Sequence, residues 1–181
     1  MATTLVIEPA LKEDYPAVID VLVAGYMQYQ ETYEQKEVWE QYLKEIRESV
    51  HNPEIKELWV AKIEDRIIGT VQLFETAAKA YEGFESPIPY PFIRLLAVHP
   101  DWRGHGVARA LLQQCVQSSH VWKQPYVYLY TGERMVQAIG LYEKFGFVKD
   151  EFYSFLNNGH QVLCYRYEIE EEHAVASVKQ G

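Results

Sequence analysis

Residues 103–109, which read RGHGVAR, have the composition of an anion-binding turn. Gly104 and Gly106 allow the backbone to approach a ligand closely. The apolar run Phe92–Val98 before the turn predicts a buried strand, and the apolar spacing from Ala108 onward predicts a helix. Because a helix begins with unpaired N–H groups and a partial positive charge, a strand, a glycine turn and a helix in this order predict a phosphate site.

Two common phosphate-binding patterns do not match this turn. The P-loop pattern GxxxxGK, followed by Ser or Thr, fails because neither its spacing nor its lysine is present. The dinucleotide pattern GxGxxG starts at Gly104 and Gly106, but Arg109 stands in place of the third glycine. An oxidoreductase that binds an adenine dinucleotide is kept as an alternative, and the missing glycine and the lack of a preceding Rossmann unit count against it.

A third pattern matches the turn. Arg103-x-x-Gly106-x-Ala108 resembles the (Gln/Arg)-x-x-Gly-x-(Gly/Ala) signature of the GCN5-related N-acetyltransferases, the GNAT family, whose loop binds the pyrophosphate of acyl-coenzyme A. The Ala-Val-His-Pro that ends the strand and the Ala-Leu-Leu that follows the turn are similar to the same family. The resemblance implies a coenzyme site made of Leu96, Ala97, Val98, Arg103, Gly104, His105, Gly106, Val107, Ala108 and Arg109.

Residues 138–147, AIGLYEKFGF, resemble the second hallmark of that family. There a helix ends in Leu-Tyr-Glu-Lys-x-Gly-Phe and the tyrosine hydroxyl faces the coenzyme sulfur, which implies that Tyr142 donates a proton to the leaving thiolate. A phenol with a pKa of about 10 is still protonated at neutral pH and can donate to a thiolate whose conjugate acid has a pKa of about 8.5. Met135 departs from the family, which often has Asn at this position to hold the pantetheine arm.

Acetyl transfer to a primary amine also needs a proton acceptor. The ammonium group, with a pKa of about 10.4, must lose a proton before it attacks the thioester carbonyl. Glu75, at the end of a predicted hairpin, is the first candidate, followed by Glu82, Glu85 and His99. No spacing rule selects one of these four residues.

Composition excludes several other classes of function. The net charge of −9 argues against a nucleic-acid partner, which calls for a basic patch, and favours cationic amines. No apolar stretch is long enough to span a membrane and no signal peptide is recognisable, so a cytoplasmic location is expected. Cys115 and Cys164 fall on apolar faces and are interpreted as core residues. The histidines lack metal-ligand spacing, so no metal is predicted.

The sequence predicts an α/β domain of mixed α+β type over residues 1–170, followed by a polar tail over 171–181. The expected fold resembles that of the GNAT family: a central mixed, mostly antiparallel sheet of about seven strands with helices on both faces. A predicted helix separates the strand Phe92–Val98 from the strand Pro125–Tyr130, so these two strands are expected to be parallel, joined by a right-handed crossover. The expected strands are Leu5–Ile7, Leu58–Ile63, Ile67–Phe74, Phe92–Val98, Pro125–Tyr130, Phe147–Phe155 and Gln161–Ile169.

Two connecting segments are candidates for the acceptor site. Residues 75–91 are long and rich in aromatic residues and proline, which favours an ordered wall of that site over a mobile surface loop. Residues 30–35, between two predicted helices, contain Tyr33 and two glutamates. They are interpreted either as the mouth of a pocket or as a solvated loop.

The resemblance implies an acyltransferase that moves an acetyl group from acetyl-CoA to a primary amine by direct attack in a ternary complex. The acceptor is expected to be a small molecule or a peptide, with no nucleic-acid or membrane partner. The late hairpin at Asn157–Gly159 offers an edge for a homodimer. A domain that binds acyl-CoA as a sensor or scaffold without turnover is the alternative.

Overall fold

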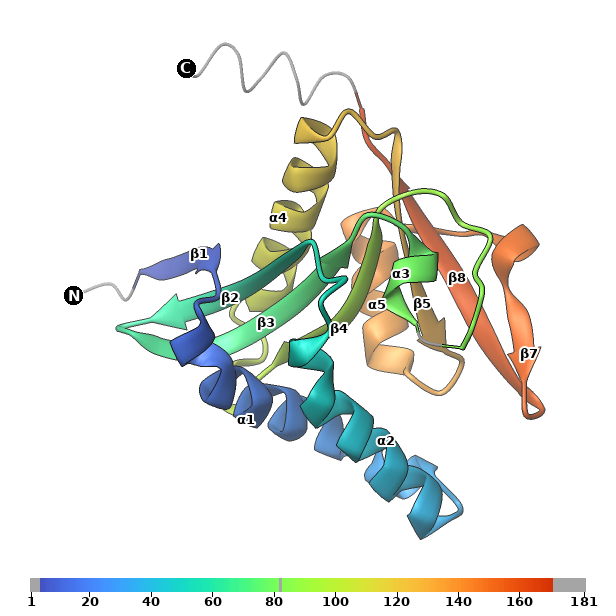
Figure 1. Ribbon diagram of the computed structural model, residues 1–181, viewed down its shortest axis with the longest axis horizontal. Helices are drawn as coiled ribbons and strands as arrows, with labels where there is room; N and C mark the ends of the chain where they lie inside the picture. Colours follow the sequence, from blue (N-terminus) through green and yellow to red (C-terminus); the bar gives the residue numbers. More distant parts are fainter. Residues whose placement is uncertain (1–3, 82, 171–181) are drawn as a thin grey trace. The chain divides into compact units, whose positions relative to one another are not determined.

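The computed structural model describes residues 4–81 and 83–170 (Figure 1). These residues form two compact units. The first contains the described residues up to Leu73 together with Arg94–Leu112, and the second contains Phe74–Ile93 together with the described residues from Gln113 onward. The predicted tail over 171–181 lies outside the described residues.

The sheet of the first unit has the strand order β1-β2-β3-β4. Strands β1 and β2 pair antiparallel, as do β2 and β3. Glu64 and Asp65 connect β2 to β3 with φ angles of 49° and 65°, so the hairpin turns over two residues instead of the three that were predicted. The strands are β1 (Leu5–Pro9), β2 (Glu57–Ile63), β3 (Arg66–Phe74) and β4 (Phe92–Val98).

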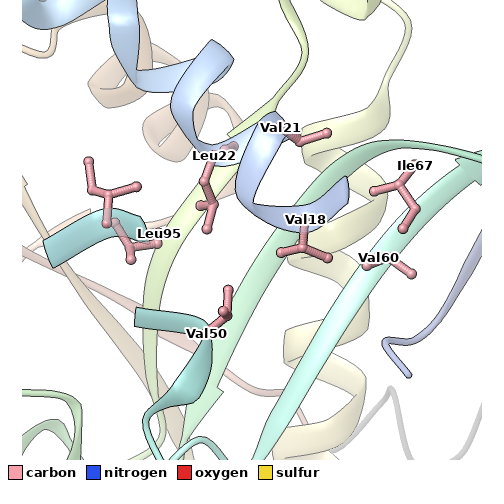
Figure 2. Packing of buried hydrophobic residues seen from close by; sticks show 9 residues of the cluster. Val18, Val21, Leu22, Val50, Val60, Ile67 and Leu95 are labelled. Atoms are coloured by element: carbon pink, nitrogen blue, oxygen red, sulfur yellow. The ribbon is translucent and has the colours of Figure 1, made fainter. Parts of the chain in front are cut away.

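Helices α1 (Tyr15–Tyr26) and α2 (Lys36–Glu48) lie side by side against this sheet (Figure 1). Pro16 stands in the first turn of α1, where its missing N–H costs no helical hydrogen bond. The buried side chains of α1 lie beside those of the strands, as Figure 2 shows. The cluster consists of Val18, Val21, Leu22, Ile46, Val50, Val60, Ile67, Leu95 and Ala97. Short 3-10 helices join the elements: η1 (Lys12–Asp14), η2 (Met27–Thr32), η3 (Ser49–His51) and η4 (Pro100–Trp102).

Helix α4 (Val107–Val121) begins in the first unit and packs against β3. A Cβ built at Gly69 would lie 2.8 Å from Val107 Cγ1, 3.1 Å from Leu111 Cδ1 and 3.4 Å from Ala61 Cβ. Gly69 pairs with Ala61 and Thr70 pairs with Val60, so α4 contacts the face opposite to the one that carries Val60. The predicted placement of helices on both faces is confirmed.

The second unit contains the parallel strand pair. Phe92 and Ile93 of β4 pair with Tyr128 and Leu129 of β5, which confirms the crossover through α4. The strand order is β4-β5-β8-β6, with β7 also paired to β8, and every pair except β4–β5 is antiparallel. The predicted mixed, mostly antiparallel sheet is therefore confirmed. The remaining strands are β5 (Tyr126–Gly132), β6 (Val148–Lys149), β7 (Phe155–Asn157) and β8 (His160–Glu168).

The single strand predicted over Phe147–Phe155 is wrong. This segment divides into β6, the 3-10 helix η5 (Glu151–Tyr153) and β7. Asp150 ends β6: its N–H donates to Cys164 O, and its Oδ1 accepts the N–H of Phe152 and caps η5. The hairpin signal that follows is confirmed, because Asn158 and Gly159 adopt φ angles of 51° and 80° and β7 pairs with β8 across them.

Two further helices belong to the second unit. Helix α5 (Val136–Phe145) ends as predicted at Gly146, which has a φ of 123° and donates its N–H to Tyr142 O and Glu143 O. Helix α3 (Ala77–Ala80) is a single short turn inside the segment that the sequence left without regular structure. Cys115 and Cys164 are both fully buried, which confirms their interpretation as core residues. Within the described ranges, no helix combines the length and apolar content that crossing a membrane requires.

The close packing of α4 on β3 gives a test. We expect Gly69→Ala to lower the free energy of unfolding by about 1–3 kcal/mol, because the new methyl group overlaps Val107 in a packed core. Gly140→Ala is the matched control: it lies within α5, a Cβ there meets no atom within 4 Å, and it should raise stability by about 0.5–1 kcal/mol. Urea denaturation measures both variants. Equal stabilisation by the two alanines would contradict the packing.

Candidate functional site

Strand β4 contains a leucine in an unusual backbone conformation. Leu95 has a φ of 53° and is 6% exposed. The left-handed conformation costs an L-residue about 1–2 kcal/mol, and residues held in it concentrate at functional sites. Leu95 directly precedes Leu96, Ala97 and Val98, whose backbone was expected to hold pantetheine. The sequence carries no signal for this conformation, because two leucines in an apolar run predict regular strand.

The chain after β4 folds into a compact turn. His99 Nδ1 accepts the N–H of Asp101 at 3.1 Å, and Trp102 N donates to His99 O at 2.9 Å. The ring of His105 lies edge-on to Trp102 with centroids 5.6 Å apart, and its Nδ1 is 3.0 Å from Arg103 O. These local contacts give the predicted anion-binding turn a defined shape.

The two glycines of the turn expose backbone at the start of α4. Gly104 and Gly106 have φ angles of 81° and 78°, and a Cβ built at either residue meets no atom within 4 Å. Ala110 N donates to Gly106 O at 3.1 Å, so the N–H groups of Val107 and Ala108 precede the hydrogen-bond ladder of α4. Open space, unpaired helical N–H groups and the positive end of a helix dipole fit a phosphate group.

The side chain of Arg103 contacts another element of the first unit. Its Nη2 donates to Gly25 O at 3.2 Å, near the C-terminal end of α1. A Cβ built at Gly25 would lie 3.0 Å from Ala97 Cβ, so α1 touches β4 at this point. No motif in the sequence singles out Gly25. A contact across 78 positions of sequence leaves no local signal.

Tyr142 lies on α5 in the second unit. It is 9% exposed, and its ring stands edge-on to Phe147 with centroids 5.9 Å apart. The next residue, Glu143, accepts a hydrogen bond from the Tyr165 hydroxyl of β8 at 3.0 Å. Phe147 N donates to Tyr142 O at 2.9 Å, beside the turn at Gly146. The helix end that carries Tyr142 is therefore fixed by contacts on both sides of it.

Met135 occupies the N-cap position of α5 and makes no side-chain cap hydrogen bond. Its sulfur accepts a hydrogen bond from Thr131 Oγ1 at 3.6 Å, and its N–H donates to Gly132 O at 3.0 Å. Asparagine is a strong N-cap residue because its side-chain oxygen accepts helical N–H groups, whereas a thioether is a weak acceptor. The departure from the family pattern therefore falls on a residue that begins the helix carrying Tyr142.

The candidate proton acceptors lie in different settings. Glu75 Oε2 is 2.8 Å from Lys79 Nζ, and both side chains are 44% exposed. Glu85 is exposed, and His99 uses its Nδ1 within the turn after β4. Glu82 lies outside the described residues. Glu75 is thus the candidate that already contacts a primary ammonium group, the chemical class of the expected acceptor.

The segment over residues 75–91 is held to β5 by aromatic packing. Tyr81 and Phe84 contact Tyr130 with ring centroids 6.1 Å and 6.4 Å away, and Phe84 stacks on Phe155 at 5.2 Å. Ser86 Oγ and Tyr130 Oη share a hydrogen bond of 2.7 Å. The structure therefore gives the described residues of this segment, 75–81 and 83–91, a defined course. That this segment forms a wall of the acceptor site stays a prediction.

The connection between α1 and α2 is also packed by aromatic rings. Tyr33 stacks on Tyr42 with centroids 5.8 Å apart and lies 5.2 Å from Trp39. Burial, followed by the nearby Glu45 carboxylate, raises the pKa of Tyr33. The solvated-loop interpretation of residues 30–35 therefore does not hold for Tyr33, whereas Glu31 and Glu34 are exposed.

Burial raises the pKa of Cys164 to about 12, so this thiol stays protonated at neutral pH. Across residues 4–81 and 83–170, no three His, Cys, Asp or Glu side chains gather as a candidate metal site.

A family model described as the acetyltransferase (GNAT) domain matches residues 54–149, more than half of the chain. The chain belongs to the GNAT family. The matched region of this GNAT chain includes the glycine turn, the start of α4 and Tyr142, whereas Gly25 lies before it.

A curated relative, an acetyltransferase of Pectobacterium atrosepticum, is 31% identical over 94 residues, which are 52% of this chain and 57% of the relative. The PaiA N-acetyltransferase of Thermoplasma acidophilum, solved with coenzyme A, has a TM-score of 0.66 at 18% identity over 91% of this chain and 99% of its own. A candidate acetyltransferase of Salmonella typhimurium, solved with its cofactor acetyl-CoA, has a TM-score of 0.60 at 14% identity over 92% and 95%. These structures share the fold of this GNAT chain.

The structure brings part of the predicted GNAT site together within one unit. Leu96–Val98, the glycine turn and the first turn of α4 follow one another in the first unit, with the side chain of Arg103 against α1. Tyr142 and Glu75 belong to the second unit, on α5 and before α3. Val107 is buried against Gly69, so it can offer a ligand only its backbone.

The buried, hydrogen-bonded Tyr165 makes the free energy of unfolding depend on pH in the alkaline range. Burial, followed by the Glu143 carboxylate, raises the pKa of Tyr165 to about 12. Between pH about 10 and about 12 the tyrosine ionises in the unfolded chain but stays protonated in the folded protein. The contribution of Tyr165 to the free energy of unfolding is therefore fully present below pH about 10 and is lost as the pH rises to about 12. We expect Tyr165→Phe to flatten the fall in unfolding free energy between these pH values, measured by urea denaturation at several pH values.

Glu143→Gln serves as the control for this pH effect. It removes the carboxylate but leaves Tyr165 buried, so the upper limit of the window should move to lower pH while the lower limit stays. Parallel stability curves for the wild type and Tyr165→Phe would contradict the assignment.

Proposed function

We propose that this chain transfers an acetyl group from acetyl-CoA to a primary amine by direct attack in a ternary complex. The observation that carries the proposal is the turn from Arg103 to Ala108, with its two left-handed glycines and unpaired helical N–H groups. The family match agrees with it, because the loop that binds pyrophosphate in GNAT proteins has the same sequence pattern.

The chain binds the coenzyme chiefly through backbone groups in this proposal. The N–H groups of Val107 and Ala108 lie at the start of α4, where the helix dipole favours the pyrophosphate. Gly106 leaves open the space that a side chain would fill. The backbone of Leu96–Val98 binds the pantetheine arm, and the bound coenzyme supplies the thioester.

Tyr142 and Glu75 move protons in this proposal. Tyr142 donates its hydroxyl proton to the sulfur of the leaving group, as the matched segment 138–147 implies. Glu75 accepts the proton of the acceptor ammonium, directly or through water. Glu75 must exchange Lys79 for the acceptor to do so, and the two cations are of the same chemical type.

A second function is favoured by the start of α5. Met135 replaces a residue that helps to hold pantetheine in the family, and its sulfur is engaged by Thr131. A domain that binds acyl-CoA as a sensor without turnover needs the phosphate turn but does not need Tyr142 as an acid. Release of thiol from acetyl-CoA in the presence of amines separates the two functions.

The phosphate turn is tested by Gly106→Val. We expect the dissociation constant of coenzyme A to rise at least tenfold, about 1.4 kcal/mol, because the side chain fills the open space and strains the left-handed backbone. Isothermal titration with coenzyme A measures the affinity, with NADH and ATP as control ligands. Gly159→Val is the matched control: its φ of 80° imposes the same strain at the β7–β8 turn, and it should leave the affinity unchanged. Equal affinity of wild type and Gly106→Val for coenzyme A would contradict the assignment of this turn as the phosphate-binding site.

The proposed acid is tested by Tyr142→Phe. We expect turnover to fall about 100-fold or more while the affinity for coenzyme A stays nearly unchanged, because the hydroxyl acts on the leaving group. Thiol release during a screen of primary amines measures turnover. Tyr15→Phe, at the first position of α1, should behave as wild type. Unchanged turnover in Tyr142→Phe would take the acid role away from this residue.

A further inference from the structure

One carbonyl oxygen near the end of α1 accepts two side-chain hydrogen bonds. Gln28 Nε2 donates to Gly25 O at 2.9 Å, and Arg103 Nη2 donates to the same oxygen at 3.2 Å. The last carbonyls of a helix carry partial negative charge and lack helical partners, so a guanidinium is favourable there. The positive charge of the Arg103 side chain therefore lies against the C-terminal end of α1.

Gly25 itself is held by β4. A Cβ built on it would lie 3.0 Å from Ala97 Cβ, closer than ordinary van der Waals contact, and 3.4 Å from Val98 O. Helix α1 thus meets the strand that leads directly into the phosphate turn. The oxygen that Arg103 contacts is a rigid point beside that turn.

The phosphate turn needs such a point because it is built from flexible residues. Gly104 and Gly106 both adopt left-handed conformations and are exposed, and glycine loses the most backbone freedom on ordering. The contacts of His105 with Trp102 and with Arg103 O stay within the turn, whereas Arg103 reaches α1. An anchor outside the turn reduces the ordering that ligand binding must supply.

The same guanidinium acts on the segment between α1 and α2. Tyr29 lies in η2, and burial raises its pKa while the nearby Arg103 opposes that rise. The ring of Tyr29 contacts Tyr26 at 5.8 Å, and Tyr26 contacts Tyr42 of α2 at 6.2 Å. Arg103 is therefore adjacent to an aromatic array that includes η2 and α2.

We propose that Arg103 is a positioning residue that couples the phosphate turn to residues 28–35, which include most of η2. In this proposal Arg103 does not act as a direct ligand of the pyrophosphate. This inference rests on the proposed function. Coenzyme A held by the backbone of the turn then stabilises residues 28–35 through Arg103 and Gly25. Because coupling free energies are reciprocal, a ligand that orders η2 strengthens coenzyme binding by the same factor.

Amide hydrogen exchange on the full chain tests the coupling, with coenzyme A as the probe. In the wild type we expect saturating coenzyme A to slow exchange both at residues 104–108 and at residues 28–35. In Arg103→Met the protection at 104–108 should persist at saturation, with affinity about five- to tenfold weaker, while the protection at 28–35 is lost. Arg103→Lys, which keeps a charge and a donor, should recover part of the protection at 28–35.

Arg66→Met is the matched control, since it removes an exposed arginine from the first position of β3 in the same unit and should behave as wild type. The salt dependence of coenzyme A affinity provides a second measurement, because direct charge contacts weaken as salt rises. Arg103→Met should leave that dependence unchanged.

Three outcomes overturn the inference. A flattened salt dependence in Arg103→Met would make Arg103 a direct phosphate ligand. Protection at 28–35 that survives in Arg103→Met would remove the coupling and leave the proposed function intact. No protection at 104–108 in the wild type would refute the phosphate turn, and with it both proposals.

Discussion

The first unit depends on the close approach of α1 to β4 at Gly25. Only glycine allows this approach without a shift of Ala97, because a Cβ there would lie 3.0 Å from the Ala97 methyl group. The contact places a helix carbonyl where Arg103 can reach it, and Arg103 in turn is the first residue of the phosphate turn. The buried cluster between α1, α2 and the strands holds the helix in this position (Figure 2). A backbone contact thus fixes the start of the turn that is proposed to bind the coenzyme.

The second unit contains Tyr142, the proposed acid. Contacts made by neighbouring residues fix the position of this tyrosine. Gly146 ends α5 one turn after Tyr142, and Glu143 is bound to Tyr165 of β8. The hydroxyl of Tyr142 therefore belongs to a helix end with little freedom. Aromatic packing and the Ser86–Tyr130 hydrogen bond hold the segment after Glu75 to β5 in the same unit.

A net charge of −9 is compatible with binding of a polyanionic coenzyme, because the groups proposed to meet the phosphates are local. Backbone N–H groups and a helix dipole act within the first turn of α4, and exposed carboxylates farther away are screened by salt. The overall acidity is better suited to attracting a cationic acceptor. In this proposal the local backbone geometry favours the coenzyme, and the net negative charge favours the cationic acceptor.

Local signals in the sequence were enough to predict the strand, turn and helix around residues 92–121, the end of α5 at Gly146, the β7–β8 hairpin and the family. Periodicity, glycine and short motifs all act over a few neighbouring residues. Features that depend on contacts between distant residues became visible only in the folded structure. It showed the left-handed Leu95, the break of a predicted strand at Asp150, the short helix α3 and the reach of Arg103 to Gly25. These features arise where packing overrides local preference, and the energy that selects them comes from residues far away along the chain.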